Sequence, residues 1–533
     1  MAAPIDYFPT NAPRPAQVKA LDFVRRAFEQ GYRDVVVEAP TGSGKSFVSS
    51  ALSLWAQDPA SAALAGVPGG YVLVNQKILQ DQMANDLTHF DKAKGCAALI
   101  KSAVEYACPA HKLCSHGALR GCSARKDGSC PYRMAKRAFL SAPLAITNYA
   151  YFFSERSFVG EITPRRILCL DESHNLAKLI IGFIDLKISQ SKLEDYADAD
   201  FAADLPKIDT MEKFIPWLKE KYLPAVKDHA EAIAATADMG DIKLTKEAYE
   251  VKQHYQKICA GTERLLLSTH DWIFWQQKER TGIELIARPL EAAPYFPELV
   301  QEAGALRVYL SAYPGDRATF CRELGLSPQN VAWISLDSTF PVENRPVYLA
   351  TVGSLGRACK EQNLPGALRM VRRLLDRHTG VRGIIHSHSY EFAETVVRSL
   401  EGTPHAQRLI FPKKAEDREA ALAMHKLRTD SVLISPSMAE GLDLKDDLAR
   451  FQIILKCPFA SLGDKQVAAK MERNRRWYEG EAVKTILQAC GRAVRNESDS
   501  AKTYILDSDA EKLLNKWDKD LPKWFTKALV RFS

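Results

Sequence analysis

A short stretch near the N-terminus has the residue types and spacing of a phosphate-binding loop. Residues 35–47 read VVVEAPTGSGKSF, in which β-branched residues favour a buried strand and two glycines follow it. Glycine lets successive backbone N–H groups converge on a triphosphate, and the next helix adds its positive dipole. The residues expected to bind the nucleotide are Thr41, Gly42, Ser43, Gly44, Lys45 and Ser46. Lys45 would reach the β and γ phosphates and the Ser46 hydroxyl would be a Mg²⁺ ligand. Ala39 replaces the first glycine of the pattern, so a glycine loop without a nucleotide is the alternative.

The acidic segment at residues 171–175, with the sequence DESHN, is a candidate metal and catalytic site. It directly follows the apolar run at 166–170, so its carboxylates lie at the carboxyl edge of a sheet, where open α/β sheets bind ligands. We expect Asp171 to hold Mg²⁺ and Glu172 to orient and deprotonate the attacking water. Lys45 and Mg²⁺ would neutralise the charge of the transferring phosphoryl group. Taken alone, the segment could also be an ordinary acidic turn.

Two arginines near the C-terminal end of the chain are candidates for contacts with the γ phosphate. Residues 488–495 read QACGRAVR, and the spacing of three puts Arg492 and Arg495 on one face of a predicted helix. Such a pair can act as an arginine finger, which stabilises the transition state when two sheets close over ATP. Gln488 and Gly491 beside the pair favour this interpretation over a basic helix face in water.

Four cysteines lie close together in a polar stretch. Their order is Cys108-x5-Cys114-x7-Cys122-x7-Cys130, and Pro131 follows the last of them. Four thiolates in one short loop can hold an iron-sulfur cluster or a tetrahedral zinc ion, and the spacing does not choose between them. Three nearby residues could replace a ligand: Cys96, His111 and His116. The cysteines at positions 169, 259, 321, 359, 457 and 490 are interpreted as small buried apolar residues.

The stretch around these cysteines is strongly basic. Residues 112–137 hold seven Lys and Arg residues against the single acid Asp127. A compact basic module suits contacts with nucleic-acid phosphates, which give affinity without sequence preference. Four aromatic residues could stack on bases, although core packing is the commoner role for each of them: Tyr132, Tyr149, Tyr151 and Phe152.

The composition is that of a globular protein with several domains. Of the 533 residues, 46% are hydrophobic and 26% charged, and the net charge of +7 neither demands nor excludes a polyanionic partner. The length predicts about three or four domains. Residues 1–15 contain no apolar signal segment, and we expect a cytosolic protein, in which crowded cysteines favour a metal over disulfides.

Apolar runs alternate with amphipathic stretches at both ends of the chain. A helix is predicted at 14–29, and strands are predicted at 35–37, 71–74, 144–147, 166–170 and 307–312. Beyond a boundary near 337–347, helices at 365–378, 390–400 and 481–490 alternate with strands at 382–386, 431–435, 451–456 and 502–506. This rhythm predicts two parallel sheets covered by helices. Residues 185–290 lose the strand signal and are predicted to form a mostly helical insertion.

The ordered set of motifs resembles that of superfamily 2 helicases of the XPD/DinG type. Residues 171–175 are similar to the D-E-A-H box, with Ser173 in place of alanine, and residues 310–313 to motif III, with Tyr313 in place of threonine. Segments 14–17, 79–82, 147–151, 389–390, 438–443 and 488–495 are similar to the other motifs, in the same order. The resemblance implies adenine recognition by Gln17, catalytic roles for His174 and Gln488, and nucleotide contacts from Glu440, Gly441 and Asp443. It also implies a [4Fe-4S] cluster on the four cysteines at 108–130.

The resemblance further implies an α/β fold with two RecA-like motor domains and ATP between them. Motor domain 1 is expected in three parts, at 1–105, 138–184 and 291–340, and motor domain 2 at 341–533. The iron-sulfur module (106–137) and a helical arch (185–290) are inserted in the first. We expect a monomeric DNA helicase that moves 5′ to 3′ on single-stranded DNA and unwinds duplex junctions, associated with the nucleoid of a bacterial or phage-infected cell. The alternatives are an ATP-gated nucleic-acid-binding or recruiting subunit, which the Tyr313 departure favours, and an RNA or hybrid helicase.

Overall fold

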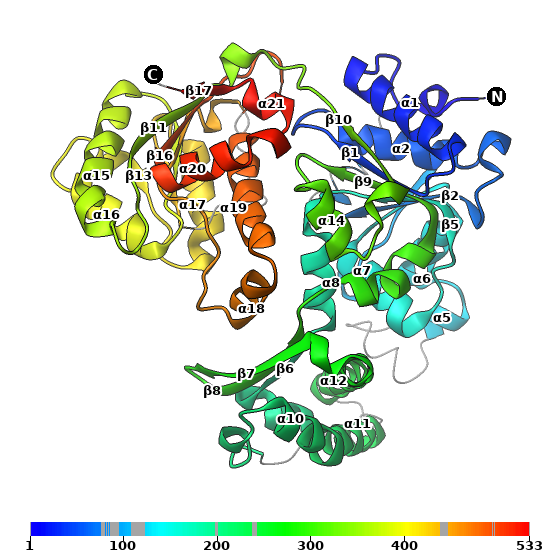
Figure 1. Cartoon of the computed structure of the whole chain (residues 1–533). Coiled ribbons are helices and arrows are strands. Elements are labelled where there is room, and N and C mark those ends of the chain that lie inside the picture. Colours follow the sequence, from blue (N-terminus) through cyan, green and yellow to red (C-terminus); the bar gives the residue numbers. More distant parts are fainter. Residues whose placement is uncertain are drawn as a thin grey trace.

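The computed structural model describes residues 2–75, 80, 81, 83, 85, 95–107, 123–197, 201–236, 242–436, 446–492, 494 and 496–531. They form two α/β domains that face each other and a third domain below them, attached to the first (Figure 1). We call them motor domain 1, motor domain 2 and the arch. Within the described part of the chain, no helix has the length and apolar character that a membrane span requires.

Motor domain 1 is built on a parallel sheet of seven strands in the order β10-β1-β9-β5-β2-β4-β3. Its strands are β1 (Asp34–Glu38), β2 (Val67–Val74), β3 (Ala97–Leu99), β4 (Leu144–Asn148), β5 (Arg165–Leu170), β9 (Gly304–Ser311) and β10 (Val331–Ser335). The five strands predicted for this domain are confirmed. The sequence did not predict the two edge strands β3 and β10, which are short or have exposed residues.

Helices cover both faces of this sheet because alternate residues of its central strands point to opposite sides. Val35 and Val37 of β1 pack with α1 (Pro15–Glu29) and α2 (Lys45–Trp55), whereas Val36 packs on the other face. That other face carries α6 (Pro131–Ser141), α7 (Tyr149–Ser154), α8 (Leu176–Ile184) and α14 (Arg317–Glu323). The carboxyl ends of the strands therefore lie between two helical layers, where the loops at 39–44 and 171–175 emerge.

Motor domain 2 repeats this plan with a second parallel sheet, in the order β13-β14-β12-β15-β16-β11-β17. Its strands are β11 (Val347–Gly353), β12 (Gly383–His386), β13 (Leu409–Ile410), β14 (Val432–Ser435), β15 (Phe451–Ile454), β16 (Lys502–Asp507) and β17 (Leu529–Arg531). Its helices are α15 (Lys360–Arg377), α16 (Tyr390–Leu400), α17 (Arg418–Leu427), α18 (Lys465–Arg473), α19 (Arg475–Cys490), α20 (Ser508–Lys516) and α21 (Lys523–Thr526). Two parallel sheets with helices on both faces confirm the predicted fold class.

The arch combines helices with a small antiparallel sheet. Its helices are α9 (Leu193–Ala197), α10 (Met211–Trp217), α11 (Leu223–Thr236) and α12 (Ile242–Leu267). The sequence analysis expected no strands here, but β6 (Leu186–Ser189), β8 (Gly282–Pro289) and β7 (Trp272–Glu279) form a sheet in that order. The aromatic run at 272–275 and Gly282, at φ +121° in the hairpin turn, were the available signals. Leu193, Trp217 and Leu285 belong to the same apolar cluster as Leu168 of β5, so the core of the arch continues that of motor domain 1.

Candidate active site and nucleic-acid channel

The loop between β1 and α2 has the backbone that phosphate binding requires. Gly42 and Gly44 both adopt φ of +79°, in the left-handed region that favours glycine. A Cβ atom added at Gly44 would lie 2.2 Å from Nε2 of Gln17. The Ser43 hydroxyl is buried and has no hydrogen-bond partner among the described residues. The loop thus has room and polar groups for a ligand at the N-terminus of α2.

The start of α1 holds this loop from the side. The Arg14 guanidinium donates a hydrogen bond of 2.6 Å to the Gly42 carbonyl, and Nε2 of Gln17 donates one of 3.3 Å to the Gly44 carbonyl. Oε1 of Gln17 accepts a hydrogen bond from the Arg14 backbone N–H. Gln17 therefore lies against the predicted phosphate loop.

Lys45 and the acidic segment meet at the carboxyl edge of the sheet. The Lys45 ammonium donates a hydrogen bond of 3.2 Å to the Ala39 carbonyl. Burial and the neighbouring Glu172 charge raise the pKa of Asp171 to about 7, and Lys45 opposes that rise. Glu172 has φ of +48°, which is uncommon for a residue with a side chain and is typical of strained functional positions. Ser46, the other expected Mg²⁺ ligand, lies exposed in the first turn of α2.

The carboxylate of Asp171 fits a cation. Its Oδ1 atom is buried and has no hydrogen-bond partner among the described residues. A buried carboxylate oxygen without a partner is costly unless a positive ligand neutralises it. Oxygen ligands on Asp171 and Ser46 are the type that Mg²⁺ prefers.

His174 links the acidic segment to β9. Its Nδ1 atom lies 2.9 Å from the Ser311 hydroxyl and 3.3 Å from the Glu172 carboxylate. Burial lowers the pKa of His174 to about 4, so the imidazole is neutral at neutral pH. A neutral imidazole donates one hydrogen bond and accepts another. His174 can therefore link Ser311 to a second group without adding charge to the site.

Motor domain 2 meets the phosphate loop at Gly491. A Cβ atom at this position would lie 2.8 Å from the Thr41 hydroxyl, so a larger residue would require Thr41 to shift. Arg492 is the next residue. Its positive charge helps to lower the pKa of His174, so Arg492 lies near the acidic segment. Gln488, half-buried on α19, is one turn before Gly491.

The expectation that Arg492 and Arg495 share one face of a helix is wrong. Helix α19 ends at Cys490, with Gly491 as its C-terminal cap, and Arg492 lies in the turn beyond it. Glycine is a poor helix former, and Gly491 caps the end of α19 close to Thr41. Arg492 thus approaches the site from a turn. Several predicted site residues lie outside the described residues: Arg495, Glu440, Gly441 and Asp443.

Of the four predicted cluster ligands, Cys130 lies within the described residues, and Cys108, Cys114 and Cys122 lie outside them. Cys130 is buried at the N-cap of α6, directly before Pro131. Its neighbours in a small apolar cluster are Ala124 and Tyr132.

A cavity of about 1640 Å³ runs between motor domain 1, the arch and motor domain 2. Its wall includes Asn75, Asn148 and His174 at the sheet edge, and Lys178 of α8. The arch adds Tyr196 and several polar residues of α12, among them Lys252, Gln253, His254 and Lys257. Motor domain 2 adds Lys470, Trp477 and Lys484 of α18 and α19. The cavity therefore combines cations with aromatic rings, as channels for single strands do.

Within the described part of residues 112–137, the expected basic surface is corrected at Lys136 and Arg133, whereas Lys126 and Arg137 are exposed as expected. Lys136 is buried, and its ammonium pairs with Glu155 at 2.7 Å and with Glu161 at 2.8 Å, while Arg133 also pairs with Glu161. Tyr149 and Phe152 are core residues, which excludes base stacking by their rings. Tyr132 and Tyr151 remain half-buried in the cavity wall, with hydroxyls 3.0 Å apart. No local pattern marked the lysines of α8, α12, α18 and α19 as cavity residues, because lysines are common on exposed helix faces.

Comparison with known proteins finds similarity to helicases. A family profile described as helicase C-terminal domain matches residues 373–528, and one described as type III restriction enzyme, res subunit, matches residues 10–179. The ATP-dependent DNA helicase YoaA of Escherichia coli strain K12 is 22% identical, over 94% of this chain and 92% of that protein. YoaA of Haemophilus influenzae is 20% identical, over 93% of this chain and 91% of that protein.

Solved structures show the same fold. An XPD helicase structure superposes with a TM-score of 0.65 and 18% identity, covering 98% of this chain and 100% of that one. An XPD structure in the apo form gives a TM-score of 0.60 and 17% identity, over 97% and 100% of the two chains. Both likenesses extend over nearly the whole chain and show a shared fold.

Proposed function

We propose that this chain, a superfamily 2 helicase of the XPD/DinG type, hydrolyses ATP to move along single-stranded DNA and to separate duplexes. One observation carries the proposal: His174 touches Glu172 at the candidate nucleotide site and also lines the large cavity. The nucleotide site and the cavity thus share a wall. A strand that passes through the cavity could therefore respond directly to the state of the nucleotide.

At the nucleotide site, the geometry supports hydrolysis of a triphosphate bound between the motor domains. Lys45 and the loop N–H groups would bind the phosphates, and Glu172 would take a proton from the attacking water. Asp171 and Ser46 would hold Mg²⁺, which supplies positive charge against the phosphoryl oxygens. Arg492 would stabilise the charge of the transition state from across the cleft, and Gln488 would support that contact.

On the nucleic-acid side, lysines of α8, α12 and α19 would contact phosphates, and half-buried aromatic rings would stack on bases. We assign residues 106–137 to an iron-sulfur module with Cys108, Cys114, Cys122 and Cys130 as ligands, and residues 185–290 to an arch over the strand. The proposed motor domains are residues 1–105, 138–184 and 291–340 for the first and residues 341–533 for the second. The direction 5′ to 3′ is part of the proposal.

Strand displacement on three kinds of substrate tests this function. We expect ATP-dependent displacement from DNA duplexes with a 5′ single-stranded tail, and little from duplexes with a 3′ tail. RNA duplexes and RNA–DNA hybrids serve as parallel substrates. Preferred displacement of hybrids would favour an RNA or hybrid helicase. ATP-dependent binding to DNA with no displacement of any substrate would favour a clamp or recruiting subunit.

Replacing Arg492 by alanine is expected to lower the rate of ATP hydrolysis by about 10³-fold, the lower range for an arginine finger, and to change ATP affinity little. The reason is that a finger acts on charge that grows in the transition state. Steady-state hydrolysis and equilibrium binding of an ATP analogue measure the two effects. Arg475→Ala, at an exposed arginine in the first turn of α19, is the matched control. An affinity that falls as steeply as the rate would contradict the assigned role.

A further inference from the structure

The segment that follows β9 reaches into the core of the other motor domain. Tyr313 leaves motor domain 1, yet its ring is 1% exposed and packs in the apolar cluster of motor domain 2 that contains Val347, Trp517 and Trp524. The Tyr313 hydroxyl has no hydrogen-bond partner among the described residues. Burial of the ring, with no contribution from its hydroxyl, therefore holds the two domains together at this point.

The two ends of α14 are bound to motor domain 2 by the same arrangement of groups. At the start, the Asp316 carboxylate lies 3.4 Å from the Arg476 guanidinium, which in turn lies 4.4 Å from the centre of the Trp517 ring. At the end, the Glu323 carboxylate lies 2.8 Å from the Lys470 ammonium, which lies 4.1 Å from the centre of the Trp477 ring. Each cation is thus fixed between a carboxylate of motor domain 1 and a tryptophan of motor domain 2.

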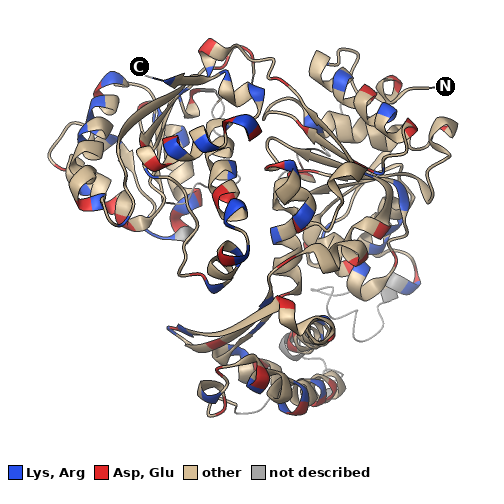
Figure 2. Cartoon of the chain, in the orientation of Figure 1, with Lys and Arg blue, Asp and Glu red and all other residues tan. Residues whose placement is uncertain are grey.

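The Glu323–Lys470 pair is only slightly exposed, although both side chains also line the large cavity. The Lys470 and Glu323 side chains are 12% and 17% exposed. Burial opposes ionisation of Glu323, but Lys470 and Lys484 outweigh it and hold the pKa of Glu323 below its usual value. Pairs with little exposure are screened weakly by salt, unlike pairs on an open surface. Figure 2 shows acidic and basic residues on α14 and on the facing helices α18 and α19.

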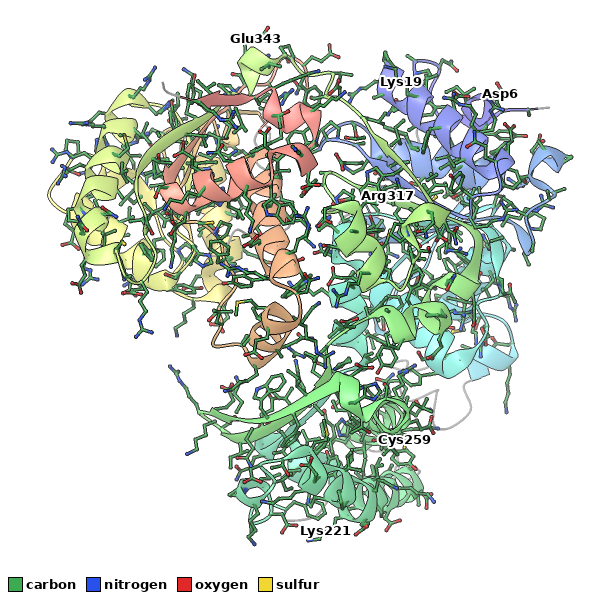
Figure 3. All side chains as sticks on the ribbon, in the orientation of Figure 1. Asp6, Lys19, Lys221, Cys259, Arg317 and Glu343 are labelled. Atoms are coloured by element: carbon green, nitrogen blue, oxygen red, sulfur yellow. The ribbon has the colours of Figure 1, made fainter. Side chains whose placement is uncertain are left out.

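Helix α14 is in turn fixed to its own domain. Arg317, labelled in Figure 3, donates hydrogen bonds of 2.6 Å to the Pro328 carbonyl and 2.5 Å to the Val331 carbonyl. The Phe320 ring packs edge-on against the rings of Tyr309 and Trp333. Helix α14 therefore moves with motor domain 1 as one body. At the nucleotide site the domains touch differently, through Gly491 and Thr41, and Thr41 belongs to the loop that ATP would occupy.

We propose that residues 313–323 form the hinge between the motor domains, so that Tyr313 and the pairs at both ends of α14 stay in contact while the nucleotide edge opens and closes. The proposal rests on the ATP-driven cycle proposed above. It assigns Tyr313 the role of a positioning residue, because its ring touches neither the nucleotide site nor the cavity wall as described. Tyr313 stands where the resembled motif III has threonine. Its burial in the core of motor domain 2 gives this difference a physical reason.

Two distances measured in the full chain test the hinge. Spin labels on unnatural amino acids, which avoid the native cysteines, would replace exposed residues in two pairs. Arg322 and Arg475 report across the hinge, and Lys19 of α1 and Lys523 of α21 report across the nucleotide edge. On adding a non-hydrolysable ATP analogue and single-stranded DNA to the wild type, the first distance should stay unchanged and the second should shorten. A longer first distance would overturn the hinge and indicate a latch that the ligands open.

Substitution of Tyr313 supplies the second arm. Tyr313→Ala should broaden the Arg322–Arg475 distance distribution without nucleotide, and DNA should no longer raise its rate of ATP hydrolysis. Its KM for ATP should stay unchanged. Tyr313→Phe is the matched control, since it removes a hydroxyl without a partner, and it should behave as the wild type. A Tyr313→Ala distribution as narrow as that of Tyr313→Phe would overturn the proposal. If the alanine variant does not fold, the wild-type distances decide alone. A wild-type protein that does not hydrolyse ATP would contradict the proposed function and would say nothing about the hinge. The two hypotheses can therefore fail separately.

Discussion

A Glu172→Gln variant is expected to bind ATP normally and to hydrolyse it about 10²–10⁴-fold more slowly, the range for loss of a general base. Glutamine keeps the shape of the side chain but cannot accept the proton of the attacking water. Glu172 is well placed for this role. It is the second residue after β5, and its carboxylate lies 3.3 Å from the Nδ1 atom of His174. Steady-state hydrolysis and equilibrium binding of ATP measure the two quantities separately. Glu343→Gln, at an exposed glutamate of the interdomain connection, is the control.

Lys45→Ala is the contrasting variant at the same site. Here ATP binding itself should weaken, because the ammonium would contact the phosphates of the bound nucleotide before any chemistry occurs. Lys19→Ala, an exposed lysine of α1, controls for the loss of a positive charge. A Glu172→Gln protein with near wild-type hydrolysis would contradict the assignment of the base, whatever Lys45→Ala shows.

A Cys122→Ser variant is expected to lose strand separation and to keep ATP binding. Metal binding is the main source of folding free energy for a module too small and polar to form its own core. We expect loss of one ligand to disorder the module and its contacts with DNA, and therefore also to abolish stimulation of ATP hydrolysis by single-stranded DNA. The disorder should extend no further than about Pro131, because the ion pairs of Lys136 with Glu155 and Glu161 anchor α6 to motor domain 1. ATP binding should survive because the sheet of motor domain 1 has its own apolar core.

Iron and zinc content, visible absorption and unwinding measured on the same preparations check this expectation. Cys359→Ser, at the half-buried cysteine before α15, is the control. A wild-type protein purified without oxygen that carries about one zinc ion and no iron would contradict the cluster. A Cys122→Ser variant that unwinds normally would contradict the structural role of that cysteine.

Features set by neighbouring residues in the sequence were predicted well. The turn between β1 and α2 followed from glycines that the chain needs at φ of +79°, a requirement that the local backbone imposes. The two parallel sheets followed from apolar runs of strand length between helical stretches, because buried parallel strands are apolar on both faces. Asp171 and Glu172 were found because they directly follow such a run.

Features set by packing between distant segments were missed or misjudged. Lys136 was counted as a free cation, because the sequence does not show that Glu155 and Glu161 fold against it. In the arch, the pairing of β6 with β8 joins residues about a hundred positions apart, which the sequence does not show, whereas the β7–β8 hairpin had a local signal that was overlooked. Arg492 was placed on a helix because the sequence does not show that α19 ends at Cys490, where motor domain 2 approaches Thr41.

The sequence by itself determined which residues could bind a phosphate, hold a cation or accept a proton, since these abilities belong to the side chains and to the loops that carry them. The tertiary structure alone decided which of them meet. It brings His174 of one strand end to Ser311 of another, and it gives the nucleotide site and the cavity a common wall. It also places Tyr313 in the core of the opposite motor domain. The physical reason is that each of these contacts depends on burial of apolar surface shared by segments far apart in the chain, which no local pattern records.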